Sequence, residues 1–137
     1  MEINRRLIKR KAAEIKNAIE GLKSVASAGK GAFLSNPTTI DASKYRLLVA
    51  IEAAFSICNH IAARLGKKIP ESYSDCFIIL WEEGFVPKEL SDRLARMAKF
   101  RNMLVHLYWE IDDAKVFEII EKDSKDLYEF IETMNKI

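Results

Sequence analysis

Apolar residues recur at steps of three and four along nearly the whole chain, which is the period of amphipathic α-helices. The first such segment covers roughly residues 3–28, and Gly29 and Gly31 are expected to end it before a loop that reaches Pro37. A second segment, residues 41–65, carries two adjacent apolar stripes and closes at Gly66. So wide an apolar surface predicts a central helix that is buried on more than one side.

The second half of the chain continues the helical period. A short helix is expected over residues 74–83, and Pro87 suits the first turn of the next one. No Gly or Pro follows, so one or two helices fill the remainder, with a break near Asp112. No strand pattern competes with the helical period. The sequence therefore predicts an all-α, up-and-down bundle of four to five helices, forming a single helical domain over residues 1–137.

The helix that begins at Pro87 has two distinct faces. Its core-facing stripe is formed by residues at steps of three and four: Leu90, Leu94, Met97, Phe100, Leu104, Leu107 and Ile111. On the opposite side, Ala98, Val105 and Trp109 alternate with polar groups. In a monomer this side of the helix would be expected to carry charged, solvated residues. An exposed aliphatic and an indole among polar residues favour a protein–protein seam. We therefore expect a homodimer through this helix, with Val105 and Trp109 in the seam.

Composition narrows the class of protein further. The chain has 137 residues, a net charge of +2, and few Gly and Pro residues, which argues against disorder and against a loop-rich fold. Cys58 and Cys76 have no metal-ligand spacing and are expected to be buried, so no metal or other cofactor is predicted. No apolar run reaches membrane-spanning length, because Glu52 interrupts the best candidate. A soluble, cytoplasmic protein that does not enter a membrane is the expectation. The basic first helix, residues 1–29, suits a polyanion or simply a solvated face.

The candidate chemistry lies in one short stretch, Arg101-Asn102-Met103-Leu104-Val105-His106-Leu107-Tyr108. On a continuous helix Asn102 and His106 would stand one above the other, and Arg101 and Tyr108 would form a second row. Metal-free cleavage of RNA needs one group to take a proton, another to give one, and a cation on the phosphate. Two copies of the helix in a two-fold dimer would supply two His106 and two Arg101 to one cleft.

Each of these residues also has a simpler explanation. Arg101 could pair with a carboxylate, Asn102 could be solvated, and a tyrosine at a core boundary is often only a packing residue. The second histidine, His60, follows the less apolar side of the central helix and is expected to be buried and hydrogen-bonded. A role for His60 beside the motif has no support from spacing.

The pattern Arg101-Asn102-x-x-x-His106-x-Tyr108 resembles the R-x4-H-x-Y signature of the HEPN superfamily and, more closely, the HepT toxins. The resemblance extends over residues 41–137 and includes the short segments Asn59-His60-Ile61-Ala62 and Pro70-Glu71-Ser72-Tyr73. It implies a HEPN-like helical domain that acts, as a homodimer, as a metal-independent RNA endonuclease toxin. Arg101 and His106 match the catalytic pair, with Asn102 and Tyr108 in support.

The resemblance also implies a type II/VII-like toxin–antitoxin pair. The partner would be an MntA-like nucleotidyltransferase antitoxin that transfers AMP to Tyr108 and so keeps RNA phosphate away from Arg101 and His106. Two alternatives stay open. One is a non-catalytic nucleotide- or substrate-binding subunit of a nucleotidyltransferase, and the other is a purely structural helical dimer in which Val105 and Trp109 matter and His106 does not.

Overall fold

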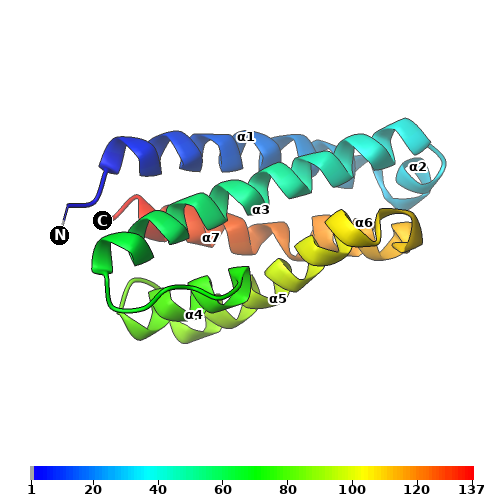
Figure 1. Ribbon diagram of the computed structural model, residues 1–137. Coiled ribbons are helices and arrows are strands. Elements are labelled where there is room, and N and C mark those ends of the chain that lie inside the picture. The colour runs from blue at the N-terminus through cyan, green and yellow to red at the C-terminus, as the bar shows by residue number, and fades with distance from the viewer. Residues whose placement is uncertain (1) are drawn as a thin grey trace.

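The computed structural model describes residues 2–137, which form a bundle of antiparallel helices with both termini at one end (Figure 1). In chain order the elements are α1 (Arg5–Ala28), α2 (Lys30–Leu34), α3 (Pro37–Leu65), α4 (Tyr73–Glu82), α5 (Lys88–His106), the 3-10 helix η1 (Tyr108–Glu110), α6 (Asp113–Lys122) and α7 (Ser124–Met134). No strand occurs in residues 2–137, so the predicted all-α class is confirmed.

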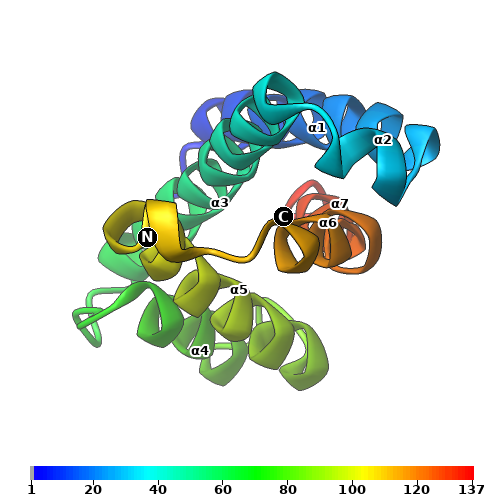
Figure 2. The same cartoon turned by 90° about the vertical axis from the view of Figure 1, so that its right-hand side faces the viewer.

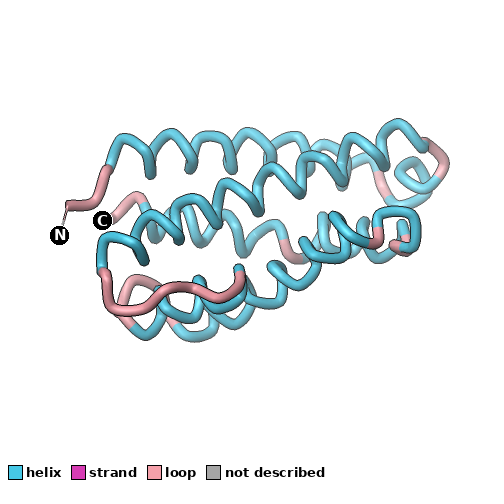
Figure 3. The backbone as a smooth tube through the Cα atoms, in the orientation of Figure 1, coloured by secondary structure: helices cyan, strands magenta, loops and turns pink. Residues whose placement is uncertain are grey.

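Polar side chains at the helix starts explain where several elements begin. Asn4, Asn36 and Ser72 each accept a hydrogen bond from the backbone N–H three residues further on, which satisfies an otherwise unpaired donor. Asp112 caps the start of α6 by accepting from the N–H of Ala114, two residues further on, at the break that the sequence predicts. Gly66 ends α3 in the left-handed conformation, with a φ of 66° that favours glycine. The loop that follows is the long connection to α4 visible in Figure 3.

The central position predicted for α3 is confirmed. It lies between α1 on one side and α4 and α5 on the other (Figure 2), and it contacts all three. Its most deeply buried stripe consists of Leu47, Ala50, Ala54, Ile57 and Ile61. By length and composition α3 could cross a membrane, contrary to the expectation that no segment could. Half of its most apolar window is nevertheless buried inside the bundle, which is how the core helix of a globular domain behaves.

Some predicted boundaries were wrong. The loop expected between Gly31 and Pro37 contains the short helix α2, and α3 begins at Pro37 rather than at residue 41. The C-terminal helix is divided at Asp123 into α6 and α7, so the described residues hold seven α-helices instead of four or five. Asn36 followed by Pro37 is a good start signal for a helix, because the side chain caps and the ring fits the first turn.

The end of α5 also differs from the prediction. The helix ends at His106, the N–H of Leu107 bonds to the carbonyl oxygen of Met103, and the chain then turns through η1. Leu107 was expected in the core but is 45% exposed, whereas Ala98, expected on the outer face, is buried at 1%. The rest of the predicted core stripe, from Leu90 to Leu104 and again at Ile111, is buried as expected.

Candidate functional site

Arg101 is held by a carboxylate and an aromatic ring on two other helices. Its Nε donates to Oε1 of Glu52 on α3 at 2.6 Å, and its guanidinium lies 4.4 Å from the ring centroid of Tyr73 at the start of α4. Tyr73 in turn donates its hydroxyl to Oε2 of Glu52 at 2.6 Å and stacks on Phe55. Burial, followed by the bond to Glu52, raises the pKa of Tyr73, so its hydroxyl keeps its proton as a donor. We refer to Glu52, Tyr73 and Phe55 as the arginine clamp.

The clamp leaves one edge of the guanidinium available. Nε is used by Glu52 and Nη1 donates to the Asn102 carboxamide oxygen at 3.3 Å, while Nη2 has no hydrogen-bond partner within residues 2–137. A guanidinium fixed through Nε and stacked on a ring can still bind a phosphate through its outer edge. Asn102 therefore contacts Arg101 rather than His106. The expectation that Arg101 pairs with a carboxylate is correct, but the pairing does not exclude an anion.

His106 lies free at the C-terminal end of α5. Its side chain is exposed and makes no hydrogen bond to any residue that the structure describes. Imidazole is the side chain best suited to exchange protons near neutral pH, and an exposed ring at a helix end is accessible to a ligand or to a second chain. A single chain thus presents one histidine and one clamped arginine on α5.

Tyr108 does not share that helix. The predicted row of Arg101 and Tyr108 on one continuous helix is wrong, because Tyr108 begins η1 after the turn at Leu107. Its hydroxyl donates to Oδ1 of Asp41 on α3 at 2.7 Å, and the ammonium of Lys44 lies 4.4 Å from its ring centroid. Burial and the Asp41 contact raise the pKa of Tyr108 to about 12.

Lys44 completes this second cluster. It is almost fully buried and forms an ion pair with Asp113 at the start of α6, at 3.2 Å. Arg101 and Tyr108 therefore bond to different points of α3, Arg101 to Glu52 and Tyr108 to Asp41. Glu52 and Asp41 are eleven residues apart, which is about 16 Å along a helix that rises about 1.5 Å per residue. The signature residues form two clusters, with His106 exposed on the chain between them.

The surface around His106 is apolar. Met103, Val105 and Leu107 are each exposed by more than two fifths, and Trp109 is exposed by 90%. We refer to these four side chains as the apolar seam. Water contact with this much apolar surface is unfavourable, and an almost fully exposed indole is unusual for a monomer. Val105 and Trp109 thus lie on the surface as the sequence indicates, while Ala98 does not.

The second histidine belongs elsewhere. His60, near the end of α3, is half-buried, and its Nε2 accepts the backbone N–H of Asn4 before α1 at 2.9 Å. Its predicted hydrogen-bonded state is confirmed, although it is less buried than expected. Burial and the nearby positive charge of Arg64 lower the pKa of His60, which keeps the imidazole neutral and able to accept. No contact links His60 to Arg101 or to His106 in the described part of the chain.

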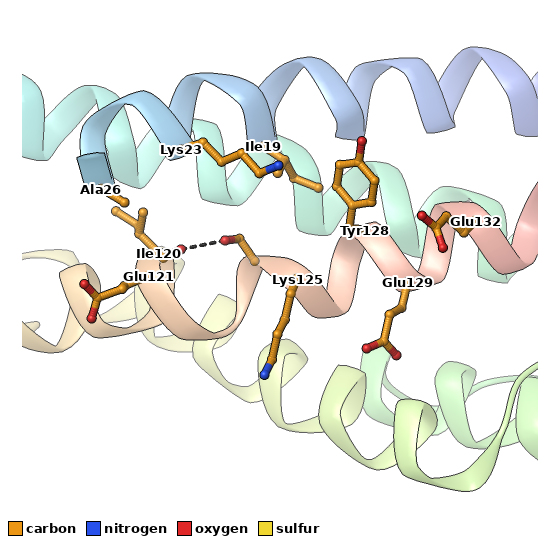
Figure 4. Close-up of a pocket in the computed structure, with 10 residues that line it drawn as sticks. Ile19, Lys23, Ala26, Ile120, Glu121, Lys125, Tyr128, Glu129 and Glu132 are labelled. Carbon is orange, nitrogen blue, oxygen red and sulfur yellow. Dashed lines mark hydrogen bonds between the residues drawn. The ribbon is translucent and has the colours of Figure 1, made fainter. Parts of the chain in front are cut away.

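Other candidate sites are less suited to the predicted chemistry. Cys58 and Cys76 are buried, as predicted, and burial raises the pKa of the Cys58 thiol, which makes it a poor nucleophile. Between residues 2 and 137, no three or more His, Cys, Asp or Glu side chains gather in a way that could hold a metal ion. A groove of about 360 Å³ lies between α1 and the consecutive helices α6 and α7, with Lys23 on the α1 wall and Tyr128 on the α7 wall (Figure 4). None of its lining residues comes from α5 or η1.

Glu52 and Asp41 are the site residues that the sequence analysis missed. Glu52 was noticed only as an interruption of an apolar run, and Asp41 only as a possible helix start. A carboxylate in the middle of the apolar run of α3 was a usable signal for Glu52, because a charge there needs a partner.

The chain matches one protein family and is similar to a curated bacterial protein over most of its length. The family model described as "Ribonuclease HepT-like" matches residues 15–134. The chain is 30% identical over 128 residues to the mRNA nuclease HepT of Shewanella oneidensis, covering 93% of this chain and 96% of that protein.

Two solved structures have a similar fold. The tri-AMPylated Shewanella oneidensis HEPN toxin, solved in complex with an MNT antitoxin, superposes with a TM-score of 0.87 at 30% identity, covering 96% of this chain and 98% of that one. The cytosolic protein YutE of Bacillus subtilis gives a TM-score of 0.85 at 19% identity, covering 98% and 90% of the two chains, which is a likeness of fold alone.

Proposed function

This chain belongs to the HepT-like ribonuclease family, and on that premise we propose that it is a metal-independent RNA endonuclease, the toxin of a HepT–MntA type toxin–antitoxin pair. The observation that carries the proposal is the pairing of a clamped Arg101, with one edge free, and an exposed His106 five residues later on α5. A similar Shewanella oneidensis protein is named as an mRNA nuclease, which supports RNA as the substrate class.

The active assembly in this proposal is a two-fold homodimer. The apolar seam surrounds His106, so burying Val105 and Trp109 against a second copy would bring the two α5 ends together. The single cleft on the two-fold axis would then hold two Arg101 and two His106 side chains, one of each from either copy. Cleavage would need both copies, because a single protomer offers only one imidazole, that of His106, on α5.

The chemistry follows from these groups. One His106 takes the proton from the RNA 2′-hydroxyl as its oxygen attacks the adjacent phosphorus, and the other gives a proton to the leaving 5′-oxygen. The free edge of Arg101 binds the phosphate oxygens as negative charge grows on them, and Asn102 keeps that guanidinium in plane. The products would carry 2′,3′-cyclic phosphate and 5′-hydroxyl ends.

Control of this activity would come from a nucleotidyltransferase antitoxin of the MntA type. A similar toxin is known in AMPylated form in complex with an MNT antitoxin, which supports Tyr108 as the acceptor of AMP in this chain. A nucleotide attached at Tyr108 would add a bulky anion beside the cleft and repel the RNA phosphate. Such a pair would act in the cytoplasm, where its RNA target is present.

The proposal is tested by incubating purified, unmodified protein with RNA in EDTA and identifying the product ends. His106→Ala should lose more than about 100-fold in rate with its helical content intact. Arg101→Lys should lose about as much, because an ammonium cannot replace a clamped guanidinium. His60→Gln, which changes the remote histidine, is the matched control and should cleave normally. Full activity in folded His106→Ala would end the proposal, and nucleotide binding without any cleavage by the unmodified protein would favour a non-catalytic binding subunit.

A further inference from the structure

The hydroxyl of Tyr108 is bonded to a carboxylate that RNA cleavage does not use. Asp41, which lies in the first two turns of α3, accepts this hydrogen bond at 2.7 Å. Because α3 and η1 are far apart in the sequence, the two residues meet only in the folded chain. We propose that Asp41 is the general base for nucleotidyl transfer to Tyr108, so that the toxin itself supplies part of the catalytic machinery for its own silencing. This inference rests on the proposed function, because it concerns how that modification takes place.

The position of Asp41 meets the geometric requirement for a general base. A base must lie within hydrogen-bond distance of the proton it removes, and 2.7 Å between Oη and Oδ1 satisfies this before any partner binds. Asp41 is exposed while Tyr108 is half-buried. An approaching transferase can therefore reach the phenol oxygen, and the proton has a route from Asp41 to solvent.

The phenol has a chemical need for a base. Its pKa of about 12 leaves only about one molecule in 10⁵ ionised at pH 7, so a waiting phenolate cannot account for efficient transfer. Proton removal has to accompany attack instead. The same contact that keeps the free phenol protonated places the proton acceptor where attack requires it.

Nucleotidyl transfer to Tyr108 exchanges one O–P bond for another. Tyr108 Oη attacks the α-phosphorus of a nucleoside triphosphate held by the transferase, and a new O–P bond forms. The bond from the α-phosphorus to the bridging oxygen breaks, and pyrophosphate leaves with that electron pair. The phenol proton passes to Asp41 Oδ1 and from there to water. The transferase supplies the triphosphate and its divalent cation.

Lys44 and Asp113 position the acceptor. The Lys44 ammonium lies 4.4 Å from the Tyr108 ring centroid and is itself fixed at 3.2 Å from Asp113. This contact restricts the ring on one face while the hydroxyl points to Asp41.

The test measures nucleotidylation of the His106→Ala protein by its cognate transferase with ATP and Mg²⁺, followed by intact mass. Asp41→Asn keeps an oxygen that can accept the phenol hydrogen bond but cannot take the proton. We expect it to lower the initial rate by about 100-fold, and Asp41→Ala to lower it as much or more. Glu110→Gln, which removes a negative charge two residues from Tyr108 without touching its hydroxyl, is the matched control and should react normally.

A second measurement separates proton removal from positioning. A ring-fluorinated tyrosine at position 108 has a more acidic phenol, so it should restore most of the rate in Asp41→Asn. A normal rate in Asp41→Asn with a slow Asp41→Ala would show positioning only and overturn the proposal, as would an equal loss in Glu110→Gln. If the unsubstituted chain accepts no nucleotide although it cleaves RNA, the antitoxin part of the proposed function fails and this inference fails with it. If it accepts nucleotide but never cleaves RNA, only the ribonuclease assignment fails.

Discussion

The arginine clamp makes a quantitative prediction about Glu52. The Glu52 carboxylate accepts two hydrogen bonds, one from Arg101 Nε and one from the Tyr73 hydroxyl, each at 2.6 Å. The Glu52→Gln substitution removes its negative charge. A glutamine has one carbonyl oxygen, so it can satisfy only one of these donors well, and its amide group faces the other. Hydrogen bonds to charged groups contribute about 1.5–3 kcal/mol, while exposed ion pairs contribute about 0–1 kcal/mol.

The exposure of the two partners decides between these ranges. The side chains of Arg101 and Glu52 are 20% and 37% exposed, so water screens the pair only in part. We expect Glu52→Gln to lower the free energy of unfolding by about 1.5 kcal/mol. With a urea slope of about 1.5 kcal/mol per molar, the midpoint should fall by about 1 M.

The assay is urea unfolding followed by circular dichroism at one fixed protein concentration, in the His106→Ala background. Glu82→Gln is the control, because it breaks a 2.9 Å ion pair with Lys68, a cation that is 56% exposed and shares the carboxylate with no second donor in residues 2–137, and it should change the midpoint little. A double-mutant cycle with Tyr73→Phe should give a coupling of at least about 0.5 kcal/mol. An unchanged midpoint in Glu52→Gln, or no coupling to Tyr73, would refute the clamp as described.

Three further predictions concern other parts of the molecule. The pKa of His60 is lowered, so the folded state disfavours protonation of its imidazole. The stability that neutral His60 contributes is therefore present above its ordinary pKa of 6.5 and is lost as the pH falls below that value. The urea midpoint should fall when the pH is lowered from about 7.5 to about 5.5, and it should fall less steeply in His60→Gln. Trp109→Ala should convert the proposed dimer to monomer in analytical ultracentrifugation while the helical signal stays constant, because the indole is 90% exposed within one chain; a dimer of unchanged affinity would remove Trp109 from the proposed interface. Tyr108→Phe loses the bond to Asp41 on a partly exposed surface, so thermal unfolding should show a loss of no more than about 1 kcal/mol, and the protein should no longer accept nucleotide; a second modified position in the intact mass would contradict this.

Much of the fold could be predicted from residue periodicity. The repeat of apolar residues is strong where one helix face is fully buried, so the central role of α3 and the core stripe of α5 up to Leu104 were both recovered. Boundaries that depend on backbone caps were harder to place. Asn36 and Pro37 carried a readable start signal, whereas the division of α6 from α7 at Asp123 has no Gly or Pro to mark it.

The site was only partly predictable, for a physical reason. Arg101, Asn102 and His106 are near in sequence, so a helical period relates them. The end of α5 before Tyr108 depends instead on tertiary contacts, namely the bond to Asp41 and the burial of Ile111 in the core. Glu52 and Arg101 likewise meet only because α3 and α5 run antiparallel at one particular offset. Local propensity carries no information on such an offset.

The composite nature of the cleft is the central claim, and a mixed dimer tests it most directly. Two differently tagged copies are produced together, one unsubstituted and one carrying both Arg101→Ala and His106→Ala, and the dimer holding one of each is isolated by sequential affinity steps. If both copies contribute to each cleavage event, this dimer should retain less than about a tenth of the wild-type rate on RNA. A mixed dimer that retains half of the wild-type rate would mean that each protomer cleaves by itself, which contradicts the account.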